Sequence, residues 1–411
     1  MRRAGLAALL AALAGCAGAP REAPPEPVSI LLFGDTGYDY DWLEADEYAN
    51  PLDARTFVIE ELDDWIEDYR PIEEFRIPPM HRLEATGGWV MASGQRPVAQ
   101  AATEWCAAPG RCRFAIMLGD NVYPAGGTAG ADGRDDAERF DALLRRPYEP
   151  LQQQDPDFVI YPVLGNHDWD TSREGAMAQV AWLEQSPLYD LDGIFYRRRP
   201  APDVEVFLID TTVLLAAETV YDDALAPDGT PIDTGEEDRD EPWTEPVGDE
   251  RHMLAWLEQA LAASDARWKI VAGHHPLWSS SGSKHEESKV LRRLLLPALC
   301  RHADAYVAGH DHTLEVHTDD CRTQGAEYRE RPPLVTVVSG AAGKQRPLHT
   351  PFMRWQDRTF PELRTLYARG LVWGFAEMVL DGDALTLTIV TTPDSGSGEP
   401  VVAFRHTFAG R

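Results

Sequence analysis

Leu118-Gly119-Asp120-Asn121-Val122-Tyr123 is the stretch on which the interpretation of this 411-residue chain depends. It begins at the end of the apolar run 114–118, which has the length and composition of a buried strand. The run is followed by a carboxylate and, three residues later, by a phenol. A carboxylate on such a turn can bridge two metal ions, and a phenolate is a hard ligand suited to ferric iron. Alone, the stretch is more often a simple polar loop, so the interpretation needs further ligands elsewhere in the chain.

Four further short motifs follow strand-like runs. They are GDTG with Asp35, GNHD with Asn166, His167 and Asp168, GHHP with His274 and His275, and GHDH with His310 and His312. Because α/β sheets assemble their sites from loops at the carboxyl ends of strands, these side chains can converge. Each motif alone has an ordinary explanation, such as a helix cap for Asp35 or a buried core histidine for His274. Five motifs, each after a strand, favour one shared site.

The combined donor set is large enough for two metal ions. It contains two aspartates, one tyrosine, one asparagine and three histidines, and Asp120 is the natural bridging carboxylate. Two adjacent ions can hold a phosphate by its oxygens, deprotonate a water and neutralise charge on the attacking and leaving oxygens. His167 stands next to a ligand without having to be one. It is therefore placed to protonate a leaving alkoxide, a role that suits histidine below neutral pH.

The hydrophobic pattern predicts a layered α/β fold in one domain from residue 28 to residue 411. Strands are expected at 28–33, 114–118, 158–164, 204–209, 268–272, 305–308 and 334–338, with a final hairpin over 374–390. Helices are expected at 54–69, 97–105, 137–146, 176–185, 250–263 and 288–299. This alternation of strands and helices is typical of sheets covered by helices.

Two segments interrupt this rhythm and are interpreted as insertions. The first, at about 38–91, is acidic and aromatic and carries no motif. The second, at about 218–250, is rich in Asp and Glu. It is most simply a solvated insertion, and the alternatives are a lid near the site or a calcium-binding loop.

The composition limits the possible partners. The chain has 68 acidic residues against 38 Lys and Arg, a net charge of −30, and it is 44% hydrophobic and 26% charged. The hydrophobic and charged fractions are typical of a globular protein, and the excess of acidic residues argues against nucleic acid or an anionic membrane bound through a basic face. The two-ion donor set, and not the composition, predicts a small phosphorylated substrate, and we expect a monomeric protein.

The N-terminus predicts export. Residues 1–15 have a short basic start and an apolar core that is too short to span a bilayer. Leu13-Ala14-Gly15-Cys16 is similar to a bacterial lipobox, so Cys16 is expected to carry a lipid, and 16–27 forms a Pro-rich tether. The expected location is the bacterial envelope, on the periplasmic side of the membrane or the cell surface. The alternative is an ordinary secretory signal and a secreted protein.

Four cysteines remain after Cys16, and an even number in an oxidising compartment favours two disulfides. The most local pairing joins Cys106 to Cys112 and Cys300 to Cys321. The sequence alone also permits the other two connectivities.

The ordered set GDTG, GDNVY, GNHD, GHHP and GHDH resembles the purple acid phosphatases within the calcineurin-like metallophosphoesterases. Stretches 163–168, 186–189, 256–261, 271–274 and 338–341 are similar to the small, tartrate-resistant branch, and the resemblance covers about 28–345. It implies a four-layer metallophosphoesterase fold, with two β-sheets packed as a sandwich and flanked by helices. Gly37 stands where ordinary metallophosphoesterases have a histidine, and Tyr123 stands where the purple enzymes have an iron-binding tyrosinate. The two insertions and the lipobox depart from the family pattern.

The resemblance also implies a role for each site residue. It assigns Asp35, Tyr123 and His312 to a ferric ion, Asn166, His274 and His310 to a divalent iron, zinc or manganese ion, and Asp120 to the bridge. His167 matches the family's catalytic histidine. His275 stands at a position that is tyrosine in the animal enzymes, and His285 falls near a substrate-pocket histidine of the family. Both are candidate substrate-binding residues.

The predicted activity is that of an acid phosphatase. A hydroxide held by the metal pair attacks a phosphate monoester, and His167 assists the leaving group. The alternatives are a phosphodiesterase or nucleotide hydrolase on the same fold, and, in a different class, an inactive surface-binding lipoprotein.

Overall fold

The computed structural model describes residues 26–43, 48–130, 136–238, 249–393 and 396–410. The predicted signal segment at 1–15, Cys16 and most of the predicted tether lie outside the described residues. Among the residues described, no helix is both long and apolar enough to cross a membrane.

Two sheets form the centre of the molecule. The first is ordered β15 (Val401–Ala409), β14 (Ala384–Thr392), β13 (Trp373–Asp381), β1 (Val28–Phe33), β4 (Phe114–Leu118) and β5 (Ile160–Val163). The second is ordered β12 (Leu363–Arg369), β10 (Leu314–Asp319), β11 (Leu334–Ser339), β9 (Ala305–Ala308), β8 (Trp268–Ala272), β7 (Val204–Leu208) and β6 (Tyr196–Ala201). The sheets contact each other through β13 with β10 and β11, and through β5 with β7.

The central strands are parallel and buried on both faces. β1, β4 and β5 pair in parallel in the first sheet, and β7, β8, β9 and β11 do so in the second. In β1, Ile30, Leu31 and Leu32 are fully buried, and Phe33 is 1% exposed. Continuous apolar runs of this kind are typical of strands that are covered on both sides. The carboxyl ends of these strands therefore share one edge of each sheet.

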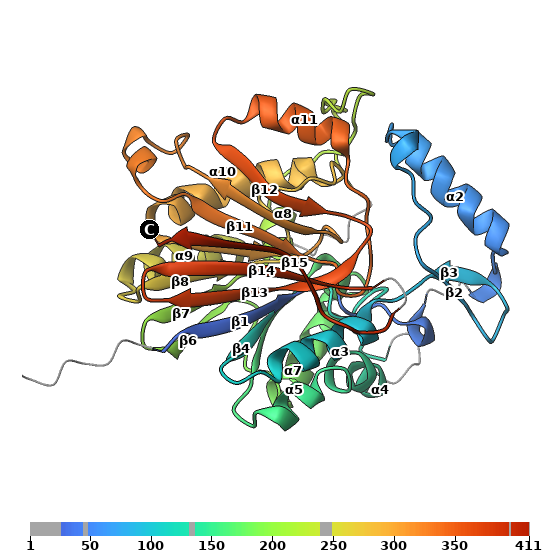
Figure 1. Cartoon of the computed structure of the whole chain (residues 1–411), viewed down its shortest axis with the longest axis horizontal. Helices are drawn as coiled ribbons and strands as arrows, with labels where there is room; N and C mark the ends of the chain where they lie inside the picture. The colour runs from blue at the N-terminus through green and yellow to red at the C-terminus, as the bar shows by residue number, and fades with distance from the viewer. Residues whose placement is uncertain (1–25, 44–47, 131–135, 239–248, 394–395, 411) are drawn as a thin grey trace, which may run out of the picture.

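Helices cover the outer faces of both sheets. In the view of Figure 1, α3 (Gln95–Cys106), α4 (Asp136–Phe140), α5 (Glu149–Gln154) and α7 (Arg173–Gln185) lie below the sandwich. α8 (Thr211–Ala216), α10 (His285–His302) and α11 (Thr350–Thr359) lie above it, and α9 (Asp249–Ala263) packs against α8 and α10. The predicted α/β sandwich of two sheets flanked by helices is confirmed.

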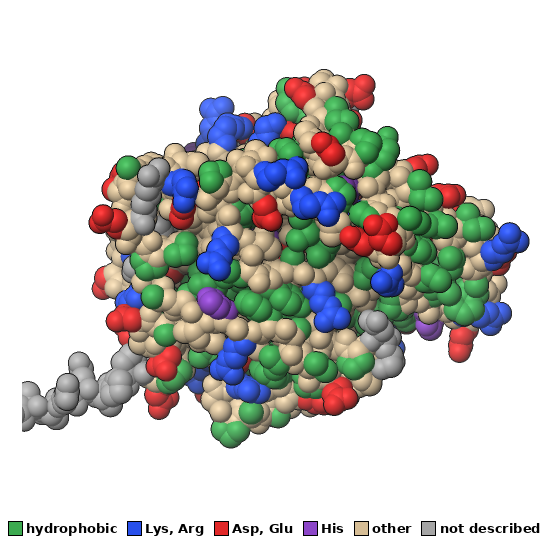
Figure 2. Space-filling model, turned by 45° about the horizontal axis from the view of Figure 1, so that its top comes forward, with side chains coloured by type: hydrophobic (Ala, Val, Ile, Leu, Met, Phe, Trp, Pro, Cys, Tyr) green, Lys and Arg blue, Asp and Glu red, His purple; other side chains and the backbone are tan. Residues whose placement is uncertain are grey.

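The first predicted insertion contains α2 (Ala54–Glu67) and a small hairpin of β2 (Met80–Arg82) and β3 (Trp89–Met91). These elements stand at one side of the body in Figure 1. In Figure 2, hydrophobic side chains gather on this lobe, while acidic and basic side chains are interspersed on the rest of the visible face. Ile66 and Ile72 of this insertion are 53% and 58% exposed.

The second predicted insertion, at about 218–250, is described over 218–238 and again from residue 249, where α9 begins. Two isolated β-bridges, Tyr221 with Glu237 and Leu225 with Pro231, fold this part back on itself. Residues 239–248 lie outside the described residues, and the calcium-loop and lid alternatives stay untested.

Both predicted disulfides are confirmed, Cys106–Cys112 and Cys300–Cys321. The hydrophobic pattern of the sequence did not predict β6, β10, β12, β15 or α11. β12 and β15 are edge strands of mixed polarity, and they exist as strands because β10 and β14 supply their backbone partners.

Candidate metal centre

The loops after β1, β4, β5, β8 and β9 converge at one edge of the two sheets. They bring together all seven predicted metal ligands, none more than 7% exposed: Asp35, Asp120, Tyr123, Asn166, His274, His310 and His312. Polar side chains buried to this degree need partners of complementary charge, so their mutual distances decide what the site can hold.

One half of the site surrounds the phenol of Tyr123. Its Oη lies 2.7 Å from Asp120 Oδ2, 3.1 Å from His312 Nε2 and 3.4 Å from Asp35 Oδ1. His312 Nε2 also lies 3.5 Å from Asp35 Oδ1. Four donor atoms thus surround one point, two from carboxylates, one from a phenol and one from an imidazole.

The other half surrounds the amide oxygen of Asn166. His274 Nε2 and His310 Nδ1 each lie 3.1 Å from Asn166 Oδ1 and 3.1 Å from each other. His274 Nε2 is 3.3 Å from Asp120 Oδ1. The two oxygens of Asp120 therefore face different halves of the site, as a bridging carboxylate requires.

The donor set fits metal ions. Metal–ligand bonds of about 2.1 Å at right angles separate neighbouring donors by roughly 3 Å, which is the spacing found in both halves. His274 Nδ1 lies 2.7 Å from the Leu118 carbonyl and donates to it, so a neutral His274 presents the Nε2 lone pair to two oxygens. Lone pairs that face one another repel unless a cation lies between them.

The pKa shifts also indicate a site that attracts cations. Burial opposes a charge on His274, but Asp120 outweighs it and raises the pKa of His274 to about 10. Burial, with Asp120 and Asp35, raises the pKa of the Tyr123 phenol well above its usual range, so a phenolate forms there only beside a cation. Burial lowers the pKa of His310 and of His312, which keeps both rings in the neutral, metal-binding form.

The backbone at the site is unusual. Asp35, Asp120 and His310 have φ values of 57°, 51° and 67°, in the left-handed region that non-glycine residues rarely adopt. A Cβ atom on Gly165 would lie 2.2 Å from Asp120 Oδ1, so the glycine of GNHD is needed for close approach. Strain of this kind concentrates at functional sites.

Asp168 joins two of the ligand loops. Its buried carboxylate accepts from the backbone N–H groups of Asn121, Val122 and Gly165, and from Gln179 Nε2. Burial raises the pKa of Asp168 to about 6. The last residue of GNHD thus holds the loop of Asp120 against the loop of Asn166 without facing the donor atoms.

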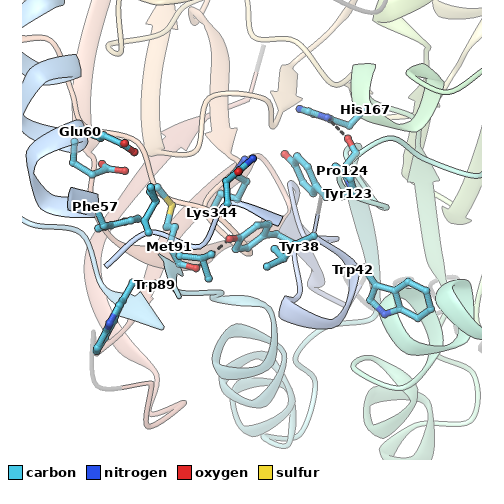
Figure 3. Close-up of a pocket in the computed structure, with 15 residues that line it drawn as sticks. Tyr38, Trp42, Phe57, Glu60, Trp89, Met91, Tyr123, Pro124, His167 and Lys344 are labelled. Carbon is cyan, nitrogen blue, oxygen red and sulfur yellow. Dashed lines mark hydrogen bonds between the residues drawn. The ribbon is translucent and has the colours of Figure 1, made fainter. Parts of the chain in front are cut away.

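His167 lies at the edge of the donor cluster. Its backbone N–H donates to Asp120 Oδ1 at 3.0 Å, and its Nδ1 lies 2.6 Å from the Pro124 carbonyl, as the dashed line in Figure 3 shows. Nδ1 is therefore the donor to that carbonyl, which leaves Nε2 as the nitrogen that can exchange a proton. The half-buried ring also lines a cavity beside the site.

The two predicted substrate-binding histidines lie in different places. His275 is fully buried behind the cluster, where its Nδ1 lies 2.7 Å from Thr211 Oγ1 and its ring lies 4.2 Å from that of His310. His285 is the first residue of α10, and its Nδ1 lies 2.7 Å from Asp223 Oδ1. It lines a separate cavity with Phe352 and Trp355, away from His167.

Three residues near the site were not predicted. Glu287 Oε2 lies 2.9 Å from His310 Nε2, in a close contact rather than an aligned hydrogen bond. Lys344 Nζ lies 4.9 Å from the ring centre of Tyr123, and Arg346 donates to Asp311 Oδ1 at 2.7 Å. No motif marks them, since they come from α10 and from the loop after β11. Their proximity depends on how these elements pack.

The sequence profile of the calcineurin-like phosphoesterase family matches residues 28–314. Tartrate-resistant acid phosphatase type 5 of Sus scrofa is 30% identical over 213 residues, which span 50% of this chain and 55% of that protein. The protein of the same name from Oryctolagus cuniculus is 28% identical over 284 residues, 67% of this chain and 74% of that protein. Purple acid phosphatase 17 of Arabidopsis thaliana is 31% identical over 239 residues, 56% of this chain and 59% of that protein.

Two solved structures share the fold at low sequence identity. GAP50, the anchor in the inner membrane complex of Plasmodium, superimposes with a TM-score of 0.56 at 16% identity. The alignment covers 94% of this chain and 90% of GAP50. The structure of PhoD gives a TM-score of 0.50 at 11% identity, over 94% of this chain and 70% of PhoD.

Proposed function

This chain belongs to the calcineurin-like phosphoesterase family, and on that premise we propose that it is a dinuclear-metal acid phosphatase that hydrolyses phosphate monoesters. The observation that carries the proposal is the position of Asp120. One of its carboxylate oxygens lies 2.7 Å from the Tyr123 phenol, and the other lies 3.3 Å from His274 Nε2. A carboxylate shared between an oxygen-rich donor set and a nitrogen-rich one suits two unlike ions.

The two donor sets differ in hardness. Asp35, Tyr123 and His312, which supply two anionic oxygens and one nitrogen, would hold a ferric ion. Asn166, His274 and His310, which supply one neutral oxygen and two nitrogens, would hold a divalent iron, zinc or manganese ion. Bound together, two such ions supply charge that neutralises phosphoryl oxygens and lowers the pKa of a water.

The chain's own residues position the substrate and handle the proton. The hydrogen bond to Pro124 fixes the orientation of the His167 ring, and the backbone N–H bond to Asp120 fixes the distance between this ring and the donor cluster. His167 would give the proton on Nε2 to the leaving oxygen, the general-acid step that typically accelerates such reactions by about 10²- to 10⁴-fold. Asp168 holds the loop of Asp120 against the loop of His167 by accepting hydrogen bonds from the backbone of both loops.

The proposal is tested by metal analysis and activity on the same purified sample. We expect two ions per chain, one of them iron, and hydrolysis of an aryl phosphate. Asp120→Asn should lose metal and activity together, because the amide cannot bridge two ions. Asp383→Asn, at an exposed hairpin turn, is the matched control and should change neither. An Asp120→Asn protein with full activity would overturn the proposal.

The alternatives are tested in the same assay. A phosphodiesterase or nucleotide hydrolase would process a bis-aryl phosphate or a nucleoside diphosphate faster than the aryl monoester. A binding protein without activity would hydrolyse none of them. GAP50, which shares the fold, is described as an anchor. The complete buried donor set supports catalysis for this chain.

We further propose that the protein is exported, anchored by a lipid on Cys16 and monomeric. Two disulfides support an oxidising compartment. Mass spectrometry of the mature N-terminus and membrane fractionation of a Cys16→Ser variant test the anchor. A variant that stays on the membrane would contradict it.

A further inference from the structure

The first insertion forms a wall of the cavity beside the metal centre. This cavity has a volume of about 520 Å³. Figure 3 shows Glu60, Phe57 and Trp89 of the insertion on one side and Tyr123 and His167 on the other, with Lys344 and Tyr38 between them. A cavity of this size is within the range that encloses a complete small-molecule ligand.

The insertion is tied to the body of the protein, so this wall has a defined place. The buried guanidinium of Arg70, just after α2, donates to the carbonyls of Pro347 and Leu348 at 3.3 and 2.8 Å. At the base of the insertion, Tyr38 Oη donates to the Met91 carbonyl at 3.1 Å, which joins the two ends of the segment. The ring of Tyr38 also packs edge-on against that of Tyr123, at 6.4 Å and 87°.

Two features of the cavity indicate what it accepts. Phe57, Trp89, Tyr38 and Trp42 line it with aromatic surface, which favours a flat ring system. At the end far from His167 lies the carboxylate of Glu60 on α2, and Glu61 of the same helix also lines the cavity. A carboxylate at that distance from the metal centre would contact a positive charge or a hydrogen-bond donor on the outer end of the ring.

The position of His167 decides which part of the substrate enters. Because His167 lines both the donor cluster and the cavity, the leaving group that takes its proton must depart on the cavity side. In the reaction, a water oxygen forms a bond to phosphorus, the bond from phosphorus to the ester oxygen breaks, and that oxygen gains a proton. The products are inorganic phosphate and a phenol or alcohol.

We propose that the cavity between α2, β3 and His167 is a leaving-group pocket for aromatic phosphate monoesters that carry a cationic or proton-donating group at the far end of the ring. This inference rests on the proposed phosphatase function. It assigns substrate specificity to an insertion that has no motif, with Trp89 as the apolar contact and Glu60 and Glu61 as the charge contact.

The test uses three monoesters: 4-(2-aminoethyl)phenyl phosphate, 4-(2-carboxyethyl)phenyl phosphate and glycerol 2-phosphate. The first two have similar phenol leaving groups and opposite terminal charges. A difference in kcat/KM between them therefore measures how the pocket responds to the terminal charge. We expect kcat/KM to be about tenfold higher for the amine than for the acid. A double variant, Glu60→Gln with Glu61→Gln, should bring this ratio close to one.

Trp89→Ala tests the aromatic contact. It should raise KM for both aryl esters about tenfold and leave kcat/KM for glycerol 2-phosphate unchanged. Ile59→Ala is the matched control, since Ile59 lies on α2 with 43% exposure and does not line the cavity. Circular dichroism and metal content establish that each variant is folded and loaded.

The outcomes separate the two proposals. A loaded wild-type protein that hydrolyses none of the three esters overturns the phosphatase function. Hydrolysis of all three esters with an amine-to-acid ratio near one, or a ratio that the double variant leaves unchanged, overturns the leaving-group pocket and leaves the phosphatase function standing.

Discussion

Tyr123 is the residue that most narrowly defines the chemistry of the site. Its phenol contacts Asp120 on its own loop and Asp35 and His312 on two other loops, and its raised pKa means that it becomes a phenolate only beside a cation. Tyr123→Phe removes this oxygen while the ring can still pack against Tyr38. If the ion beside Tyr123 is ferric, a tyrosinate-to-iron transition colours the purified protein. We expect the Tyr123→Phe variant to lose that absorption band completely.

The visible spectrum and the iron content of the same sample check this prediction. Tyr38→Phe is the control, because Tyr38 donates to a backbone carbonyl of β3 and should leave the colour unchanged. A Tyr123→Phe protein that keeps its band would show that another residue supplies the transition. A colourless wild-type protein with a full complement of metals other than iron would contradict the ferric assignment.

His167 is predicted to act on the leaving group. His167→Asn should lower turnover by about 10²- to 10⁴-fold for alkyl phosphates, whose leaving oxygens need a proton. For nitrophenyl phosphates, whose leaving groups depart as stable anions, we expect a loss below about tenfold. The dependence of log kcat/KM on leaving-group pKa measures this, and equal losses across the series would exclude the general-acid role.

Glu287 is predicted to support a ligand. Its carboxylate lies 2.9 Å from His310 Nε2, on the opposite side of that ring from Asn166. Carboxylates that contact the outer nitrogen of a ligand histidine typically contribute 10- to 100-fold to metal affinity. Glu287→Gln should weaken divalent-ion binding by this factor in a chelator competition. Glu286→Gln should not, because Glu286 contacts Lys289 and His285 instead.

At the scale of elements, α8 links the second sheet to the site. Asp210 caps this helix by accepting from the Val213 N–H group, and it also accepts from Trp169 Nε1 of the short helix α6 (Asn166–Trp169). The next residue, Thr211, contacts His275. Burial raises the pKa of Asp210 to about 7. The cap is therefore protonated over much of the acidic range.

This shift predicts how stability depends on pH. In the unfolded chain Asp210 loses its proton near pH 3.9, and in the folded protein only near pH 7, so folding becomes less favourable as pH rises between these values. The full shift corresponds to about 4 kcal/mol at most. Asp210→Asn should remove the part of the fall in unfolding free energy that this carboxyl causes. Urea unfolding from pH 4 to pH 7 measures the effect.

Asp53 provides the opposite case. It caps α2 at the surface, and backbone N–H groups of Thr56 and Arg55 lower its pKa. Asp53→Asn should therefore change the pH dependence only in acid, where stability is lost as pH falls. Identical profiles for the two variants would contradict the assignment to Asp210.

For the whole molecule, the metal centre joins the two sheets. Asp35, Asp120 and Asn166 follow strands of the first sheet, while His274 and His310 follow strands of the second. Metal that binds only the folded chain stabilises it by about 4 kcal/mol when its concentration is 1,000 times Kd. Calorimetry of loaded and chelated protein should show a lower Tm after chelation. Asp120→Asn should show little difference between the two states.

The sequence by itself determined the fold class and predicted the donor set, and it favoured the observed disulfide pairing while leaving the other two connectivities open. Parallel strands such as β1 and β4 are short continuous apolar runs, so they are visible without an alignment. Each predicted ligand lies on a turn that follows such a run. Its ability to bind a metal ion depends on its own side chain, which the sequence states directly. Cys106 and Cys112 are close enough in sequence for their pairing to be local.

Only the tertiary structure decided which groups surround that donor set. Glu287 reaches His310 because of where α10 begins, and Lys344 reaches Tyr123 because the loop after β11 folds over the site. The 38–91 insertion had no motif, yet α2 and β3 form a wall of the cavity beside His167. His285, chosen for its place in the sequence, lies at a different cavity. A motif fixes residue types on one loop, whereas distances between loops arise from the packing of whole elements.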